Sequence, residues 1–368
     1  MFLHLLKNKI NVIALTSCLT LSAFWIDLLT KKYYAQDPGG WDTALHANTL
    51  WHMIHGSLYN SFLGASFLAE HCTFLSFLVA PMYWLHPDPL ILQHLKVISF
   101  FIAAYLFFLI LKKNVHPFLA LGGMLAFCLA PANIGMLLFA FNYEPFCIPL
   151  IFFIYKSFDD IRYVHFLVGC FLLAMVKEQM PLVVMMFGVF ALIFRREQKM
   201  KWGLVPLLMG IIIFIVEIFV IIPLARKGLP STEFYYWGRY AQFGNTPGQI
   251  ISFLLTHPPA LWHSFFNEIN IRWFKELFDV WGILSVLSPH ILLLALPLFI
   301  KNLLSGWSQE HSVTGYYYAA TFTPFIFLAA WNTLNYIKNQ WRLPIQLIAL
   351  GGMFIHAFIF FPLWSMTR

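Results

Sequence analysis

Residues 10–29 read INVIALTSCLTLSAFWIDLL, and this stretch decides the fold class of the chain. A helix needs roughly 20 mostly apolar residues to cross the hydrocarbon core of a bilayer, and this stretch is long enough. Lys7 and Lys9 precede it, and no small-residue cleavage site lies near its end. We therefore interpret it as an uncleaved first membrane helix, although Leu15-Thr16-Ser17-Cys18 resembles a lipoprotein processing box.

The composition extends this interpretation to the whole chain. Of the 368 residues, 60% are apolar and only 11% are charged, against about 25% charged in soluble domains. No polar block is long enough for a separate soluble domain, so we predict one membrane domain, residues 1–368. The fold class predicted is all-α, a polytopic transmembrane helical bundle of ten or eleven helices.

The further apolar segments are uneven in length. Pro289 and Pro297 interrupt the longest of them, which predicts one kinked helix or two short ones there. The segments are residues 89–111, 117–138, 146–158, 163–176, 179–194, 203–224, 276–304, 317–333 and 343–364.

Basic residues predict the orientation, because Lys and Arg in short loops stay on the cytoplasmic side. Pairs such as Lys112-Lys113 and Arg195-Arg196 then mark cytoplasmic turns. The N-terminus is predicted to be cytoplasmic, with residues 30–88 as one external loop. Residues 72–85 are too short for a comfortable span, so we predict an interfacial helix. The net charge of +7 fits lipid headgroups, and no basic run of the nucleic-acid kind appears.

The external loop concentrates acidic and imidazole groups. Asp42, His46, His52 and His55 come before a Glu70-His71 pair. Two carboxylates that reach one cavity would suit acid/base group transfer, and Asp42 and Glu70 are the catalytic candidates. A solvated loop helix with interfacial tryptophans would explain the same residues without function.

No cofactor follows from the sequence. A divalent cation held by Asp42 and Glu70 stays open, but there is no His-Glu-x-x-His pattern and no Cys pair at ligand spacing. The five cysteines do not indicate a disulfide framework.

Charged residues also stand at other predicted external turns. Lys177-Glu178 lies between two short spans, where charge is costly and indicates a partner such as a lipid phosphate or a salt bridge. Glu144 lies at another turn. Arg239 and Tyr240 lie in an aromatic segment that would suit phosphate or sugar, or would anchor at headgroups.

Ordered motifs from Trp41 to Pro324 resemble a family of prokaryotic multi-pass membrane proteins of unknown function that is allied to the GT-C glycosyltransferases. In chain order, these motifs are Trp41-Asp42, Leu50-Trp51, His55-Gly56, Glu70-His71, Ala80-Pro81, Tyr143-Glu144, Lys177-Glu178, Gly238-Arg239-Tyr240 and Gly244 to Gly248. The chain departs from the pattern at Ala47, where a second acidic residue is expected.

The resemblance implies a GT-C-like enzyme that transfers a sugar from a polyprenyl-phosphate carrier at the outer membrane face. Asp42 would be the general base or would orient the acceptor, with Glu70 and His71 in support. Lys177 and Arg239 would hold the lipid phosphate. His55, Glu144, Glu178 and Tyr240 complete the predicted substrate-binding set, with membrane lipids and the lipid-linked donor as partners.

Two alternatives belong to other classes. A transporter or lipid flippase would use Glu217, a carboxyl in the middle of an apolar segment. A non-catalytic scaffold would use the external loop to bind a partner. The sequence does not indicate the sugar, the acceptor or the oligomeric state.

Overall fold

The computed structural model describes residues 2–35, 40–195, 198–231, 235–278, 282–336 and 339–359. Within these ranges the chain is almost entirely helical. The helices of the first half are α1 (Phe2–Tyr34), α2 (Gly40–Ile54), η1 (Phe67–Ala69), α3 (Ser76–Leu85), α4 (Leu90–Leu111), α5 (Pro117–Cys128), α6 (Pro131–Leu138), η2 (Glu144–Phe146), α7 (Cys147–Asp159), α8 (Tyr163–Ala174) and α9 (Met180–Phe194).

The second half is more broken. Its helices are η4 (Met200–Leu204), α10 (Val205–Val216), η5 (Glu217–Ile221), α11 (Ile222–Ala225), η6 (Tyr235–Tyr240), α12 (Pro247–Thr256), α13 (Pro258–Phe265), α14 (Glu268–Phe278), α15 (Gly282–Val286), α16 (Pro289–Leu292), η7 (Leu293–Ala295), α17 (Leu296–Leu304), η8 (Ser308–His311), η9 (Tyr318–Thr321), α18 (Thr323–Tyr336) and α19 (Asn339–Ile359). Two short strands, β1 (Tyr59–Asn60) and β2 (Ala65–Ser66), form an antiparallel hairpin in the first loop.

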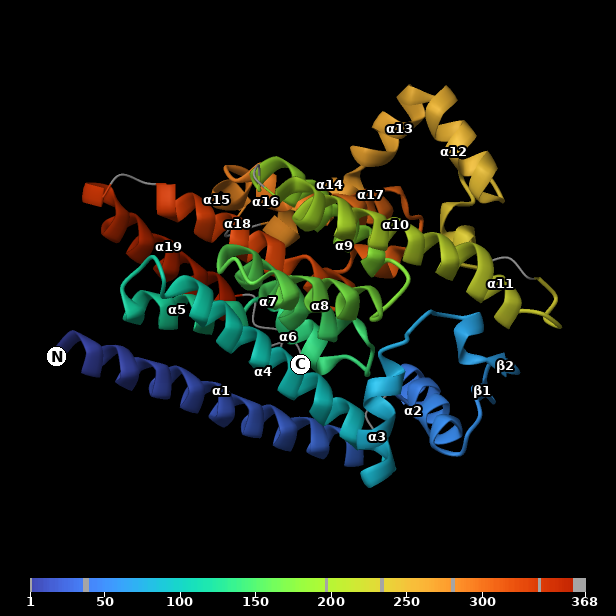
Figure 1. Cartoon of the computed structure of the whole chain (residues 1–368), viewed down its shortest axis with the longest axis horizontal. Coiled ribbons are helices and arrows are strands. Elements are labelled where there is room, and N and C mark those ends of the chain that lie inside the picture. Colours follow the sequence, from blue (N-terminus) through green and yellow to red (C-terminus); the bar gives the residue numbers. More distant parts are fainter. Residues whose placement is uncertain are drawn as a thin grey trace.

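Three helical stretches are long and apolar enough to cross a membrane, and their axes follow the long dimension of the molecule (Figure 1). They are Lys9–Tyr34, Leu90–Leu111 and Met200–Ala225. A fourth crossing is possible through α5 and α6, which meet at a bend of 50°. Pro131 begins α6 and has no N–H to continue the helix from α5, which explains the bend. The predicted all-α bundle is confirmed, while many of its apolar segments form helices of only 10–17 residues.

The two prolines of the 276–304 segment act as breaks. Pro289 stands in the first turn of α16 and Pro297 in the first turn of α17, where a missing N–H costs nothing. The sequence left open one kinked helix or two short ones, and in the part of this segment that the structure describes the chain forms short helical pieces.

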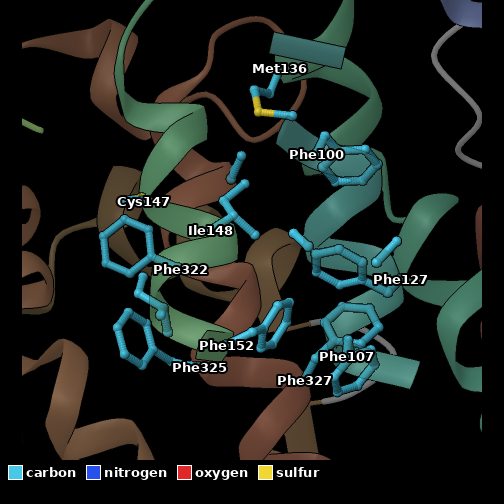
Figure 2. Close-up of a cluster of buried hydrophobic side chains, with 14 of the residues drawn as sticks. Phe100, Phe107, Phe127, Met136, Cys147, Ile148, Phe152, Phe322, Phe325 and Phe327 are labelled. Atoms are coloured by element: carbon cyan, nitrogen blue, oxygen red, sulfur yellow. The ribbon is translucent and has the colours of Figure 1, made fainter. Parts of the chain in front are cut away.

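Aromatic rings from four helices fill the middle of the bundle (Figure 2). Phe107 of α4 stacks on Phe152 of α7 with ring centroids 5.0 Å apart, and Phe127 of α5 meets Phe327 of α18 edge-on at 5.1 Å. All four rings are buried. Such packing matters in a membrane, where lipid offers little hydrophobic drive for helices to associate.

The first loop closes one end of the bundle. α2, α3 and the β1–β2 hairpin gather there beside the end of α11 (Figure 1), and the Arg226 guanidinium donates to the carbonyl of Ala69 at 3.0 Å. α3 is the ten-residue helix predicted for the interface, and it is too short to span. The opposite end carries the basic residues Lys112, Lys113 and Lys156, with Lys112 donating to Asn11 of α1 at 2.8 Å.

Candidate functional site

A cavity of about 180 Å³ lies at the same end of the bundle as the first loop. Helices α9 and α10 and the adjoining η5 give it an apolar wall of Leu182, Phe214 and Ile218, and loop segments supply most of its polar groups. The polar and aromatic side chains around it are His71, Lys177, Glu178, Gln179, Tyr236, Trp237, Arg239, Tyr240, Lys301, Glu310 and Tyr318.

Two cations share one buried carboxylate at this cavity. Glu310 Oε1 accepts a hydrogen bond from Lys301 Nζ at 2.6 Å and another from the Arg239 guanidinium. The guanidinium also lies over the ring of Tyr236, 4.2 Å from its centroid. Burial raises the pKa of Glu310, but Lys301 and Arg239 lower it by more, so the group is ionised at neutral pH. The result is a preformed cluster with a net positive charge.

Lys177 forms a second buried ion pair, with Glu144 of η2. Burial lowers the pKa of Lys177, but Glu144 and Glu178 more than offset this and raise it above its ordinary value. The ammonium also lies 5.8 Å from the centroid of the Tyr317 ring. The Lys-Glu pair predicted at the membrane boundary is thus divided between two different partners.

Glu178 binds His71, the second residue of the Glu70-His71 pair in the first loop. Its Oε1 lies 2.8 Å from His71 Nδ1, and its Oε2 accepts the Cys72 N–H at 3.2 Å. His71 Nε2 lies 2.6 Å from the Tyr236 hydroxyl. Burial raises the pKa of Glu178, but His71 and Lys177 act more strongly in the other direction and hold the pKa at about 2.

The structure brings together most of the predicted substrate-binding residues. His71, Lys177, Glu178, Arg239 and Tyr240 all line the cavity. Glu144 reaches it through its ion pair with Lys177, and Tyr240 donates to the carbonyl of Lys301 at 3.3 Å.

Asp42 is not among the residues that line this cavity. Its carboxylate accepts from the Asn142 amide at 3.0 Å. Its charge acts on His46, one turn further along α2, whose ring packs edge-on against Tyr143 with centroids 5.0 Å apart. Burial lowers the pKa of His46 to about 4, with Asp42 opposing and His71 adding to the shift. Asp42 therefore acts electrostatically on His46, which in turn interacts with His71 at the cavity.

Glu70 and His55 are also outside the lining. Glu70 ends η1 and immediately precedes His71. His55 follows α2, is exposed, and has Nδ1 2.7 Å from the carbonyl of Trp51, on whose ring it lies. Across the described ranges, no group of three or more His, Cys, Asp and Glu side chains could hold a metal ion.

Sequence reasoning missed Lys301 and Glu310, and it named Tyr236 only as one of several aromatics. Lys301 is the single basic residue of the 276–304 segment, and Glu310 is the single acidic residue of the following loop, 305–316. An isolated charge at a membrane boundary is itself a signal of function, and it could have identified both.

Glu217, the carboxyl proposed for a transporter, is buried in the π-helical segment η5. Neither of its oxygens has a hydrogen-bond partner within the described part of the chain. Cys72 Sγ lies 4.0 Å from the Glu217 carbonyl oxygen, and the Cys72 N–H donates to Glu178. Cys72 therefore connects Glu217 to the His71–Glu178 pair.

Long apolar helices, a proline-broken crossing and buried charges at a boundary together define a multi-pass integral membrane protein. The chain belongs to the family described as "Predicted membrane protein (DUF2079)", whose profile matches residues 33–368. No curated protein and no solved structure matches it.

Proposed function

We propose that this protein is a GT-C-type glycosyltransferase, which transfers a sugar from a polyprenyl-phosphate donor to an acceptor at the extracytoplasmic face of the membrane. One observation carries the proposal. The cavity combines one buried cation, Lys177, and two half-buried cations, Arg239 and Lys301, with an apolar wall formed by membrane-type helices. A lipid-linked anion needs this combination, because its phosphate seeks cations while its chain seeks an apolar surface.

The charge distribution supports an extracytoplasmic cavity. Lys112, Lys113 and Lys156 gather at the end of the bundle opposite to the first loop. By the positive-inside tendency, we propose that this end and the N-terminus face the cytoplasm, in a prokaryotic cell membrane.

The residues then divide by role. Arg239 offers a planar fork of N–H donors to the phosphate, and Lys301 and Lys177 add point charges. Tyr236 and Tyr240 provide aromatic faces for the sugar ring. Cations fixed before the reaction stabilise the negative charge that develops on the departing phosphate, without reorganisation of the site.

For Asp42 we propose the acceptor-orienting role, since its carboxylate accepts from Asn142, acts electrostatically on His46 and does not line the cavity. Glu70 supports His71 from the preceding position in the chain. His55, which is exposed just after the end of α2, would contact the acceptor.

The experiment is a transfer assay with the purified protein in lipid nanodiscs. Undecaprenyl-phosphate hexoses and pentoses serve as donors, and binding of farnesyl phosphate is measured in parallel. Arg239→Met should weaken farnesyl phosphate binding at least tenfold and abolish transfer. Arg162→Met is the matched control, because Arg162 is an exposed arginine at the N-terminal cap of α8 and does not line the cavity. Absence of transfer with every donor, or equal binding by both variants, would refute the proposal.

A transporter or flippase is the second candidate, favoured by the buried and unbonded carboxyl of Glu217. Glu217→Gln keeps the shape of the side chain and removes its proton exchange. It should abolish proton-dependent uptake if the protein is a transporter, whereas the enzyme proposal expects the larger loss from Asp42→Asn.

A further inference from the structure

Three side chains at the cavity form a continuous hydrogen-bonded series. Glu178 Oε1 lies 2.8 Å from His71 Nδ1, and His71 Nε2 lies 2.6 Å from the Tyr236 hydroxyl. The side chains of His71 and Glu178 are only 12% and 8% exposed. All three line the cavity, although they come from the first loop, the α8–α9 turn and the loop that contains η6.

The series has a defined direction. An ionised carboxylate only accepts hydrogen bonds, so the Nδ1 atom of His71 carries the proton. In the neutral imidazole, Nε2 then has a lone pair that accepts the Tyr236 hydroxyl proton. The second oxygen of Glu178 is fixed by the Cys72 N–H at 3.2 Å, which prevents the carboxylate from rotating away. A carboxylate that fixes a histidine tautomer, with a hydroxyl on the opposite nitrogen, is the geometry of an activated hydroxyl group.

Tyr236 also has a neighbour that stabilises negative charge. The Arg239 guanidinium lies 4.2 Å from the centroid of its ring. The same guanidinium belongs to the cation cluster that we assign to the phosphate. Tyr236 therefore contacts the proposed base through its hydroxyl and the proposed phosphate site through its ring.

We propose that Tyr236, His71 and Glu178 form a proton relay that deprotonates the acceptor hydroxyl, an inference that rests on the proposed glycosyl transfer. The acceptor oxygen forms a bond to the anomeric carbon as the bond from that carbon to the phosphate oxygen breaks. The bonding electron pair stays on the phosphate, whose charge Arg239 and Lys301 neutralise. The acceptor proton moves to the Tyr236 oxygen while the phenol proton moves to His71 Nε2. His71 ends as an imidazolium beside Glu178 and later releases its proton to water.

The test measures single-turnover transfer from undecaprenyl-phosphate sugars. His71→Gln and Tyr236→Phe should each lower the rate about 100-fold or more. Binding of farnesyl phosphate should stay within twofold of the unaltered protein. Tyr59→Phe, at an exposed tyrosine of the hairpin, is the control that leaves the rate unchanged. A His71→Gln variant that retains the rate of transfer would overturn the relay and leave the proposed function standing.

A second readout does not depend on transfer. Diethyl pyrocarbonate modifies the unprotonated ring nitrogen of histidine, and mass spectrometry follows the peptide that contains His71. Tyr236→Phe should accelerate this modification several-fold, because the hydroxyl that covers Nε2 is gone. An unchanged rate would contradict the relay even if no donor is ever found.

Discussion

Gly188→Ala tests the close packing of α9 against α10, which sets the apolar wall of the cavity. A Cβ atom at Gly188 would lie 2.5 Å from the backbone nitrogen of Leu207 and 2.7 Å from the carbonyl oxygen of Gly203. These distances are roughly 1 Å shorter than ordinary contact. Both neighbours are backbone atoms, so they cannot rotate away as a flexible side chain can. The two helices must separate along their whole contact.

The expected cost follows from two opposing effects. Overpacking of this kind costs about 1–3 kcal/mol, and rigid neighbours favour the upper end. Replacing glycine by alanine inside a helix returns up to about 1 kcal/mol. We therefore expect Gly188→Ala to lower the free energy of unfolding by about 2 kcal/mol.

Gly351→Ala on α19 is the matched control, since a Cβ there meets nothing within 4 Å. It should be neutral or stabilise the protein by up to about 1 kcal/mol. The assay is thermal unfolding of the detergent-purified protein, followed by tryptophan fluorescence, in which Gly188→Ala should lower the Tm by several degrees. If the two variants unfold at the same temperature, α9 and α10 do not approach as closely as the structure has them.

Three further predictions concern buried charge. His46 has a pKa of about 4 in the folded state against 6.5 in the unfolded chain. About 3 kcal/mol of stability should therefore be lost as the pH falls from 6.5 towards 4. Urea titrations should detect this loss, and His46→Gln should remove it. Glu310→Gln leaves two half-buried cations facing each other, so it should destabilise the protein by about 3 kcal/mol, and farnesyl phosphate should raise the Tm of this variant more than that of the unaltered protein. Lys96 donates to the carbonyls of Leu137 and Phe139 at 2.9 and 2.6 Å; Lys96→Met should cost about 2–4 kcal/mol in thermal unfolding, against less than 1 for the more exposed Lys113→Met.

Hydrophobicity and proline placement predicted the helices well. The α4 helix begins and ends close to the predicted 89–111 segment, and the prolines at 289 and 297 broke the late segment as expected. Both signals are local, because a proline removes its N–H whatever surrounds it. The bend between α5 and α6 was missed, since the hydrophobicity of residues 117–138 is continuous across Pro131.

The candidate site was predictable only in part. Lys177 and Glu178 stood out because charge at a membrane boundary is costly wherever it occurs, and Arg239 stood out because it lies in an aromatic segment. Glu144 was also predicted and Glu310 was not, but neither ion pair was predicted, since both form only through tertiary packing. Asp42 looked central because its loop is rich in acidic and imidazole groups, but α2 directs that carboxylate towards Asn142. The direction of a side chain within a loop helix depends on how the whole loop docks, which spacing alone does not determine.

The pairing at the cavity has a consequence for any anionic ligand. Lys177 binds Glu144, while Arg239 and Lys301 share Glu310. A phosphate that enters must therefore take hydrogen bonds that carboxylates now hold, so binding is an exchange and not a simple addition. The cluster around Glu310 should attract an anion more strongly, because two cations that share one negative charge keep a net positive charge, whereas the Lys177 pair is neutral. If the proposed function holds, we expect Arg239 and Lys301 to be the cations that meet the phosphate first, with the Tyr236 ring beside Arg239.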